Sequence, residues 1–411
     1  MNRIQTSNKF FFSTSLCRLL FISALFLSIC CSGFCIPGLC VTAQAQAVDF
    51  YYPKEKKSRF PRLPGEYEPQ RALILSVSDW QPHHSPIFTQ IVRETAGHVD
   101  LVVLFNDRAQ LVRTIDWLKE AKLKADHVSF SQIPLDTVWL RDFAPMFAET
   151  ESGPVLSVDY YYVGGQRPKD DKLAEQWANL SDAKLKEVPW TLQGGNLLVN
   201  GKSLGVTTSK IFKDNKITFP GGNRRYRNAD FDSRKIVTDA FLKECNLKLL
   251  VVLEPLMFEA TGHCDMFATF LADDTVVVAS VDPRADRFNA GILDRNAERL
   301  GKIQIGDRPM KVHRIKIPPR RGTAWSAYTN VIIANDLVLM PVMDTDPAAM
   351  IEQAKQVYRD LLPDHEVKTI DMTSMKSLQG ELHCLSASLP EFAPLPNNLI
   401  SLERAQELLG K

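Results

Sequence analysis

The sequence predicts an α/β fold assembled from about five supersecondary units. Strand-like and helix-like segments alternate along the chain, and no low-complexity or linker segment divides it. Residues able to do chemistry recur at nearly regular intervals of 54, 67, 67 and 54 residues, at Asp142, Asn196, His263, Asn330 and Cys384. Such spacing is typical of units that each send one loop to a shared centre. Sequence self-similarity is weak, so a plain α/β sheet domain remains the alternative.

The first third of the chain alternates apolar runs with amphipathic ones. Pro86 opens a segment with helical spacing, and we expect Ser85 to be its N-cap. The expected strands are 72–77, 101–105 and 128–133, and the expected helices are 86–98 and 108–123.

The second half predicts two hairpins, because paired apolar runs flank the short turns Asp273-Asp274 and Asn335-Asp336. The hairpin strands are 267–271 with 276–280, and 331–334 with 337–342. Helical patterns cover 236–245 and 347–362, and 249–253 is typical of a strand.

The first 47 residues differ from the rest. They carry three basic residues, no acid, a short apolar stretch at 19–29 and small-residue cleavage sites at Ala45 and Ala47. This pattern indicates a secretory signal peptide and predicts an exported protein, periplasmic or secreted if the source is bacterial. The stretch before Cys30 weakly resembles a lipoprotein box, so contact with a membrane is expected only through the signal or a lipid anchor. We divide the remainder into an extended segment at 48–66 and one catalytic domain at 67–411.

Charge and cysteine content narrow the class further. The formal net charge of +1 gives no indication of nucleic-acid binding. Beyond residue 47 only Cys245, Cys264 and Cys384 remain, which is no disulfide framework and leaves at least one thiol free. Whether Cys245 pairs with Cys264 stays open.

Gly262-His263-Cys264-Asp265 holds a histidine and a carboxylate two residues apart. If the segment is a strand, His263 and Asp265 enter one pocket and Cys264 packs on the other face. By the same reasoning His383 turns away if Cys384 faces the pocket, which makes His263 the better acid/base candidate.

Trp139-Leu140-Arg141-Asp142 places a flat ring close to a carboxylate. A guanidinium can stack on an aromatic face while a carboxylate binds its N–H groups. A packed Trp139 with an Arg141–Asp142 pair is the structural alternative.

Five motifs in order, Trp-x-Arg-Asp, Gly-Gly-Asn, Gly-His-x-Asp, Tyr-Thr-Asn and Leu-His-Cys, resemble the agmatine deiminase and bacterial peptidylarginine deiminase family of guanidine-modifying enzymes. The resemblance covers about residues 60–390. It implies a five-bladed, pseudo-fivefold α/β propeller with Cys384 as nucleophile, His263 as general acid/base, and Asp142 and Asp265 gripping the guanidinium. The candidate substrate-binding residues are Trp139, Arg141, Arg167, Asn196 and Asn330.

The chain departs from the family pattern at three places. Ala144 stands where the family often has glycine, Gln193 where an acid often precedes Gly-Gly-Asn, and Gln379-Gly380-Glu381 where a glycine-rich run is common. No catalytic group is lost. A free thiolate attacking the guanidinium carbon, with His263 moving the protons, needs neither metal nor other cofactor.

The expected substrate is peptidylarginine, because export places the enzyme among peptides and proteins, and Arg167 is the candidate for holding a peptide carboxylate. Agmatine is the alternative. An amidinotransferase that uses the same thiouronium intermediate and an inactive guanidine-binding propeller are further alternatives. The sequence does not fix the oligomeric state.

Overall fold

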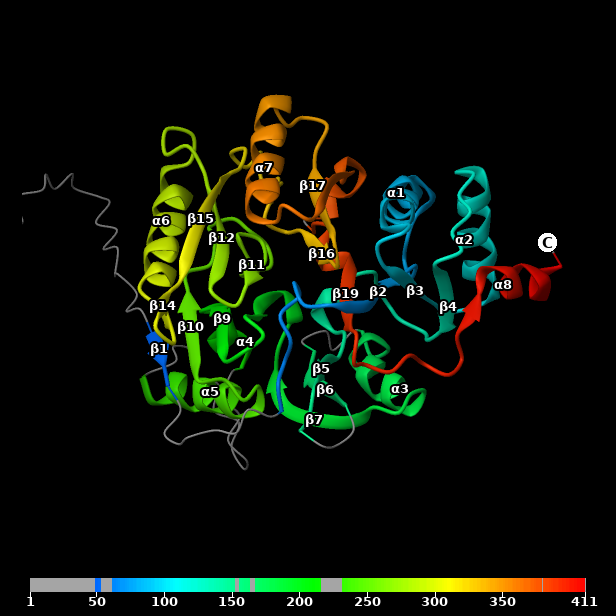
Figure 1. Cartoon of the computed structure of the whole chain (residues 1–411), viewed down its shortest axis with the longest axis horizontal. Helices are drawn as coiled ribbons and strands as arrows, with labels where there is room; N and C mark the ends of the chain where they lie inside the picture. Colours follow the sequence, from blue (N-terminus) through cyan, green and yellow to red (C-terminus); the bar gives the residue numbers. More distant parts are fainter. Residues whose placement is uncertain are drawn as a thin grey trace, which may run out of the picture. The chain divides into compact units, whose positions relative to one another are not determined.

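Five mixed sheets repeat one connection pattern in the described part of the chain (Figure 1). In each, a first strand pairs antiparallel with a second, at least one helix follows the second, and a further strand joins the second in parallel. The computed structural model describes residues 49–52, 61–151, 155–162, 167–215, 231–378 and 380–410. The chain from Val48 to Lys411 forms one compact unit. The expected signal peptide lies outside the described residues, and the division at residue 67 stays a prediction.

The largest sheet joins the two ends of this unit. Its order is β19 (Ser386–Pro390), β2 (Gln70–Ser76), β3 (Asp100–Phe105), β4 (Val128–Gln132) and β20 (Ile400–Ser401), with helices α1 (Ser85–Thr95), α2 (Arg108–Glu120) and α8 (Leu402–Leu409). Helix α2 begins where the Asp107 side chain accepts a hydrogen bond from Gln110 N. The expected N-cap of α1 is wrong: Ser85 is already helical, because the preceding 3-10 turn η1 (Pro82–His84) runs directly into the helix.

Two further sheets follow in sequence. One holds β5 (Met146–Ala148), β6 (Leu156–Tyr161) and β7 (Lys184–Thr191) with η3 (Asp170–Lys172) and α3 (Leu173–Asn179). The other holds β1 (Asp49–Tyr51), β10 (Leu249–Leu253), β9 (Leu204–Thr208) and β8 (Leu198–Val199) with α4 (Lys210–Asp214) and α5 (Phe231–Glu244). Strand β10 is apolar and buried throughout, as its uninterrupted Leu/Val run predicts.

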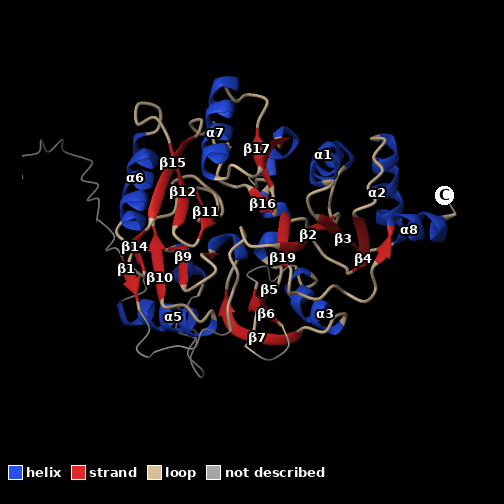
Figure 2. Cartoon of the chain, viewed as in Figure 1, coloured by secondary structure: helices blue, strands red, loops and turns tan. Residues whose placement is uncertain are grey.

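The last two sheets confirm both expected hairpins. One contains β11 (Ala268–Ala272), β12 (Thr275–Ser280) and β15 (Lys311–Lys316), and the other β16 (Ile332–Ala334), β17 (Leu337–Val342) and β18 (Glu366–Asp371). Their helices are α6 (Arg287–Gly301) and α7 (Ala348–Leu361), which pack against strands of these sheets (Figure 2). A small hairpin of β13 (Gln304–Ile305) and β14 (Arg308–Pro309) follows α6, and η5 (Thr373–Leu378) follows β18.

The regular spacing in the sequence has a structural counterpart. Each recurring motif lies in the turn directly before the first strand of one sheet. Asp142 in η2 (Leu140–Asp142) precedes β5, Asn196 in η4 (Gly194–Asn196) precedes β8, Asp265 precedes β11, Asn330 precedes β16, and Cys384 in η6 (His383–Leu385) precedes β19. The five sheets therefore present equivalent turns. No helix among the described residues combines the length and apolarity that crossing a bilayer requires.

Candidate active site

Gly195 marks the point where three predicted catalytic side chains meet. A Cβ atom built on this glycine would lie 2.8 Å from Nδ1 of His263, 2.9 Å from Oδ2 of Asp265 and 3.2 Å from Oδ1 of Asp142. Real Cβ atoms do not approach neighbours this closely, so only glycine fits without displacing these groups. The two carboxylates and the histidine thus share one centre, although they come from different turns.

Asp142 reaches this centre from η2 with one oxygen uncommitted. Its Oδ1 atom is buried and has no hydrogen-bond partner among the described residues, while the backbone N–H of Gly195 donates to the carboxyl group. Burial raises the pKa of Asp142, His263 opposes the rise, and the nearby charge of Asp265 adds to it. A positively charged group bound here would stabilise the ionised form.

The side chain of Asp265 is positioned by a contact with His383. Residues 263–265 do not form a strand; the segment is a loop that tightens into a turn just before β11. His263 and Asp265 still converge, and Cys264 packs away from them with its Sγ 3.5 Å from the carbonyl oxygen of Val206. Asp265 Oδ2 lies 2.8 Å from Nδ1 of His383, whereas Oδ1 is buried without a partner in the described structure.

The contacts of His263 define which of its nitrogens can move a proton. Lys210 Nζ donates to Oε1 of Gln193 at 2.9 Å, which orients this amide oxygen, and the same oxygen lies 2.5 Å from His263 Nε2. Because an amide oxygen only accepts, Nε2 must carry the hydrogen. The other nitrogen, Nδ1, makes no hydrogen bond among the described residues and lies 3.5 Å from Asp142 Oδ1. It faces the centre and is free to exchange a proton with a substrate.

Cys384 lies in η6 with its sulfur buried beside this cluster. Its Sγ atom is 3.8 Å from Oδ1 of Asn330. Burial raises the pKa of the thiol well above its usual range, and the charges of Asp265 and Asp142 raise it further. The thiol is therefore protonated in the ligand-free protein at neutral pH, and a bound cation would favour the thiolate.

A row of hydrogen-bonded polar side chains extends from Asp265 away from the centre. His383 bridges Asp265 and Glu66, with its Nε2 atom 2.7 Å from Glu66 Oε2, and Arg141 binds the other oxygen of Glu66. Burial raises the pKa of Glu66, but Arg141 and His383 outweigh it and hold the value at about 2. Burial and Arg141 lower the pKa of His383, yet Glu66 and Asp265 raise it more, so His383 is a cation between two carboxylates. These two cations balance Glu66 and Asp265, whereas no described lysine or arginine forms an ion pair with Asp142.

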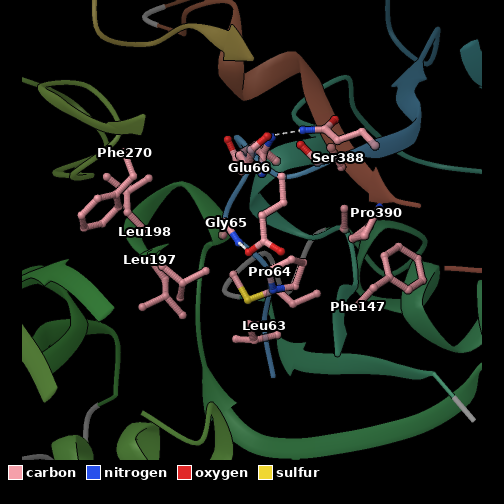
Figure 3. A pocket seen from close by; sticks show the side chains of 18 of the residues that line it. Leu63, Pro64, Gly65, Glu66, Phe147, Leu197, Leu198, Phe270, Ser388 and Pro390 are labelled. Carbon is pink, nitrogen blue, oxygen red and sulfur yellow. Dashed lines mark hydrogen bonds and ion pairs between the residues drawn. The ribbon is translucent and has the colours of Figure 1, made fainter. Parts of the chain in front are cut away.

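A pocket adjoins the Glu66 end of this chain (Figure 3). Apolar side chains such as Leu63, Phe147, Leu197 and Phe270 line most of it. Glu66 and Arg141 form part of its wall, whereas none of the four predicted catalytic residues lines it. The cavity is therefore a separate space behind the site.

The predicted substrate-binding residues have different surroundings. Trp139 packs on the nucleophile's segment, because a Cβ at Gly380 would overlap its ring. Arg167 donates to the hydroxyl of Tyr162 at 2.9 Å. The Asn330 side chain accepts from the backbone N–H of His383 and donates to the carbonyl of Asp265, so it ties the nucleophile turn to the Asp265 turn.

Two of these residues have described contacts that turn toward other parts of the protein, and their predicted role in binding stays a prediction. Asn196 uses its side-chain oxygen to accept from the backbone N–H and hydroxyl of Thr208, so its described contacts support β9. The guanidinium of Arg141 binds Glu66 and lines the rear cavity. Neither side chain has a described contact with Cys384, because each belongs to a tight 3-10 turn in which neighbouring side chains point in different directions.

The arrangement suits one type of ligand. Two buried carboxylate oxygens, one each from Asp142 and Asp265, lack partners beside a thiol and an available imidazole nitrogen. A planar cation with several N–H groups supplies the donors that these oxygens lack. Within the described residues no cluster of His, Cys, Asp and Glu has the geometry of a metal site.

Comparison with known proteins gives a consistent result. A family model, the Porphyromonas-type peptidyl-arginine deiminase, matches residues 62–390. The chain is 25% identical over 312 residues to the agmatine deiminase of Pseudomonas fluorescens, covering 66% of this chain and 79% of that protein.

Solved structures match over most of their length. The agmatine deiminase of Enterococcus faecalis superimposes with a TM-score of 0.65 at 19% identity, covering 81% of this chain and 96% of that one. The C. jejuni agmatine deiminase gives a TM-score of 0.62 at 17% identity, covering 84% and 97%. These likenesses establish a shared mixed α/β fold. Since the family model also runs through all the turns that carry the site, the chain belongs to the Porphyromonas-type peptidyl-arginine deiminase family and is a hydrolase that acts on amidines.

Proposed function

We propose that the protein hydrolyses the guanidinium group of a small substrate of the agmatine type to a ureido group and ammonia. One observation carries this proposal: Asp142 and Asp265 each have a buried oxygen near the Cys384 thiol that has no hydrogen-bond partner among the described residues. A guanidinium placed between them would gain charge-assisted hydrogen bonds in a poorly solvated site and be fixed in one plane.

The first half-reaction forms a bond from sulfur to carbon. As the cation binds, it offsets the carboxylate charges that hold Cys384 protonated, and the thiol gives its proton to His263 Nδ1. The thiolate then attacks the central carbon. His263 returns the proton to one nitrogen, which leaves as ammonia, and a thiouronium remains on Cys384.

The second half-reaction uses water. His263 Nδ1 takes a proton from a water molecule as its oxygen attacks the same carbon. The carbon–sulfur bond breaks, the thiol is restored, and the ureido product is released. Agmatine would give N-carbamoylputrescine.

The choice of agmatine over the expected peptidylarginine is supported by the relatives, several of which carry the name agmatine deiminase. A second candidate, peptidylarginine, is supported by the family's description and by Arg167. Arg167 bonds to Tyr162, and burial together with the charge of Asp142 raises the pKa of Tyr162 to about 12, so this pair lies close to the centre. An arginine there could hold a peptide carboxylate.

Two further expectations join the proposal. We propose that the five repeated sheets close into a pseudo-fivefold propeller with the motif turns around its axis, which would account for their spacing. We also propose export with cleavage near Ala45 or Ala47. The N-terminal sequence and location of the mature protein in cell fractions test the second point.

The test of function is ammonia and ureido-product formation by the purified protein from agmatine, a peptide with C-terminal arginine, and free arginine. Agmatine is expected to give the highest kcat/KM. Cys384→Ala is expected to abolish turnover, and Cys245→Ala, which removes another buried thiol outside the centre, is the matched control. Turnover retained in Cys384→Ala would refute the mechanism, and faster turnover of the peptide would refute the substrate.

A further inference from the structure

A third buried carboxylate lies next to the nucleophile and is absent from the mechanism. Glu381 precedes Cys384 by three residues and is only 3% exposed. Its Oε2 atom has no hydrogen-bond partner among the described residues, and the backbone N–H of Ala327 donates to the carboxyl group. An unpaired buried acid is unfavourable for stability, so its presence calls for a ligand or a protonated state.

Glu381 lines a small pocket with room for about one water-sized group, which is the size of an ammonium head. A second acid and an aromatic ring, Glu259 and Trp325, also line it, and none of its described lining residues is basic. The described lining is Glu259, Met266, Thr323, Trp325, Met343, Gly380 and Glu381. Such a space, acidic with an aromatic wall, suits a compact cation such as a primary ammonium.

The cavity lies between the two segments that carry the reacting groups. Glu259 accepts a hydrogen bond from Gly262 N at 2.5 Å, directly before His263. Gly380 packs on Trp139, and the backbone N–H of Glu381 donates to the Cys384 sulfur. Met266, on its inner wall, lies 3.7 Å from the Asn330 amide nitrogen. A ligand with its guanidinium at Cys384 could therefore place its other end here.

The ionisation of Glu381 agrees with a ligand that brings its own positive charge. Burial raises the pKa of Glu381 well above its usual range, and the neighbouring Asp346 raises it further. Asp346 itself is satisfied by the Ser326 hydroxyl and by Met343 N, at 2.7 and 2.9 Å. An arriving ammonium would offset this effect and stabilise the ionised form of Glu381.

We propose that this cavity binds the distal ammonium of the substrate, with Glu381 as its counter-ion. The inference rests on the proposed function and narrows the range of substrates. The preferred substrate carries a guanidinium at one end and an ammonium at the other, joined by a short alkyl chain. A C-terminal arginine, which would bring a carboxylate toward the same acids, is disfavoured.

The test compares agmatine with n-butylguanidine, which lacks only the amino group. The measured quantity is the ratio of their kcat/KM values, in which any effect of Glu381 on the thiol cancels. We expect a high ratio in the wild type and a fall of roughly tenfold or more in Glu381→Gln, since a charged hydrogen bond is lost. Asp346→Asn, which removes a nearby acid outside the cavity lining, is the control and should leave the ratio high.

The outcomes separate the two proposals. Absence of turnover with every guanidine would refute the proposed function. Turnover of agmatine with a ratio that Glu381→Gln leaves unchanged, or that Asp346→Asn lowers equally, would overturn the ammonium site alone.

A second measurement does not depend on replacing Glu381. In Cys384→Ser, calorimetric titrations give the dissociation constants of agmatine and n-butylguanidine. Agmatine is expected to bind about tenfold or more tightly, because only its ammonium can pair with Glu381. Equal dissociation constants for the two ligands would overturn the inference.

Discussion

Replacing Glu66 with glutamine should measure how strongly the chain behind the site stabilises the protein. The pKa of Glu66 falls from 4.5 to about 2 on folding, because Arg141 and His383 outweigh the effect of burial. At about 1.4 kcal/mol per pKa unit, this shift corresponds to about 3 kcal/mol of stability at pH 7. The figure is an upper value, since the side chain is 28% exposed and keeps part of its hydration.

The pH dependence provides the sharper test. A carboxylate with a lowered pKa stabilises the fold fully above its unfolded pKa, and this contribution is lost as the pH falls through the folded pKa. The difference between wild type and Glu66→Gln should therefore shrink from about 3 kcal/mol at pH 7 to about 2 kcal/mol at pH 3.5.

Urea unfolding at both pH values measures this difference, and thermal unfolding at pH 7 should show a fall of about 4 °C in Tm. Glu366→Gln, which removes an exposed acid paired with Lys368, should change little. A loss that is the same at both pH values, or that is below about 1 kcal/mol at pH 7, would refute the assigned role of the network.

Three predictions concern the centre itself. Gly195→Ala should fold, because the added methyl group clashes only with side chains, but it should lose most activity because that group displaces His263 and the two aspartates. Circular dichroism and turnover measurements together check this. An active alanine variant would contradict it. Gln193→Glu should move the acid limb of the kcat/KM profile to higher pH, since a carboxylate stabilises the imidazolium where an amide does not and the thiol can pass its proton only to a neutral His263; an unchanged profile would contradict the contact. Cys384 should react slowly with iodoacetamide at pH 7 and faster as pH rises, because its raised pKa keeps the thiol protonated; rapid alkylation of the free protein at pH 7 would show otherwise.

The sequence was sufficient for much of the local structure. Hairpins around Asp273-Asp274 and Asn335-Asp336 were predictable because apolar alternation and turn residues coincide there. The convergence of His263 with Asp265 was also predicted, but through a strand that does not exist. A turn brings both side chains to Gly195 equally well, so a correct neighbourhood followed from an incorrect local conformation.

The residues that support the catalytic side chains could not be predicted from sequence motifs. Glu66 lies 317 positions from its partner His383, and nothing around it in the sequence signals a role. Gln193 was noticed only as a departure from a family pattern, whereas its contacts with His263 and Lys210 required coordinates. Glu381 lies three residues before Cys384, and nothing in the sequence distinguishes it from other acidic residues. Its burial and the lack of a hydrogen-bond partner for its Oε2 atom among the described residues can be seen only in the folded chain.

The pairing of β19 with β2 has a consequence for the order in which the protein matures. This ladder joins a segment made near the start of synthesis to one made near its end, and the nucleophile lies just ahead of the late strand. A ribosome must therefore release nearly the whole polypeptide before the thiol can dock beside its acids. Until then the nascent chain contains the other residues of the centre but does not have the Cys384 sulfur beside them. A chain that ends before β19 is therefore expected to have no hydrolase activity.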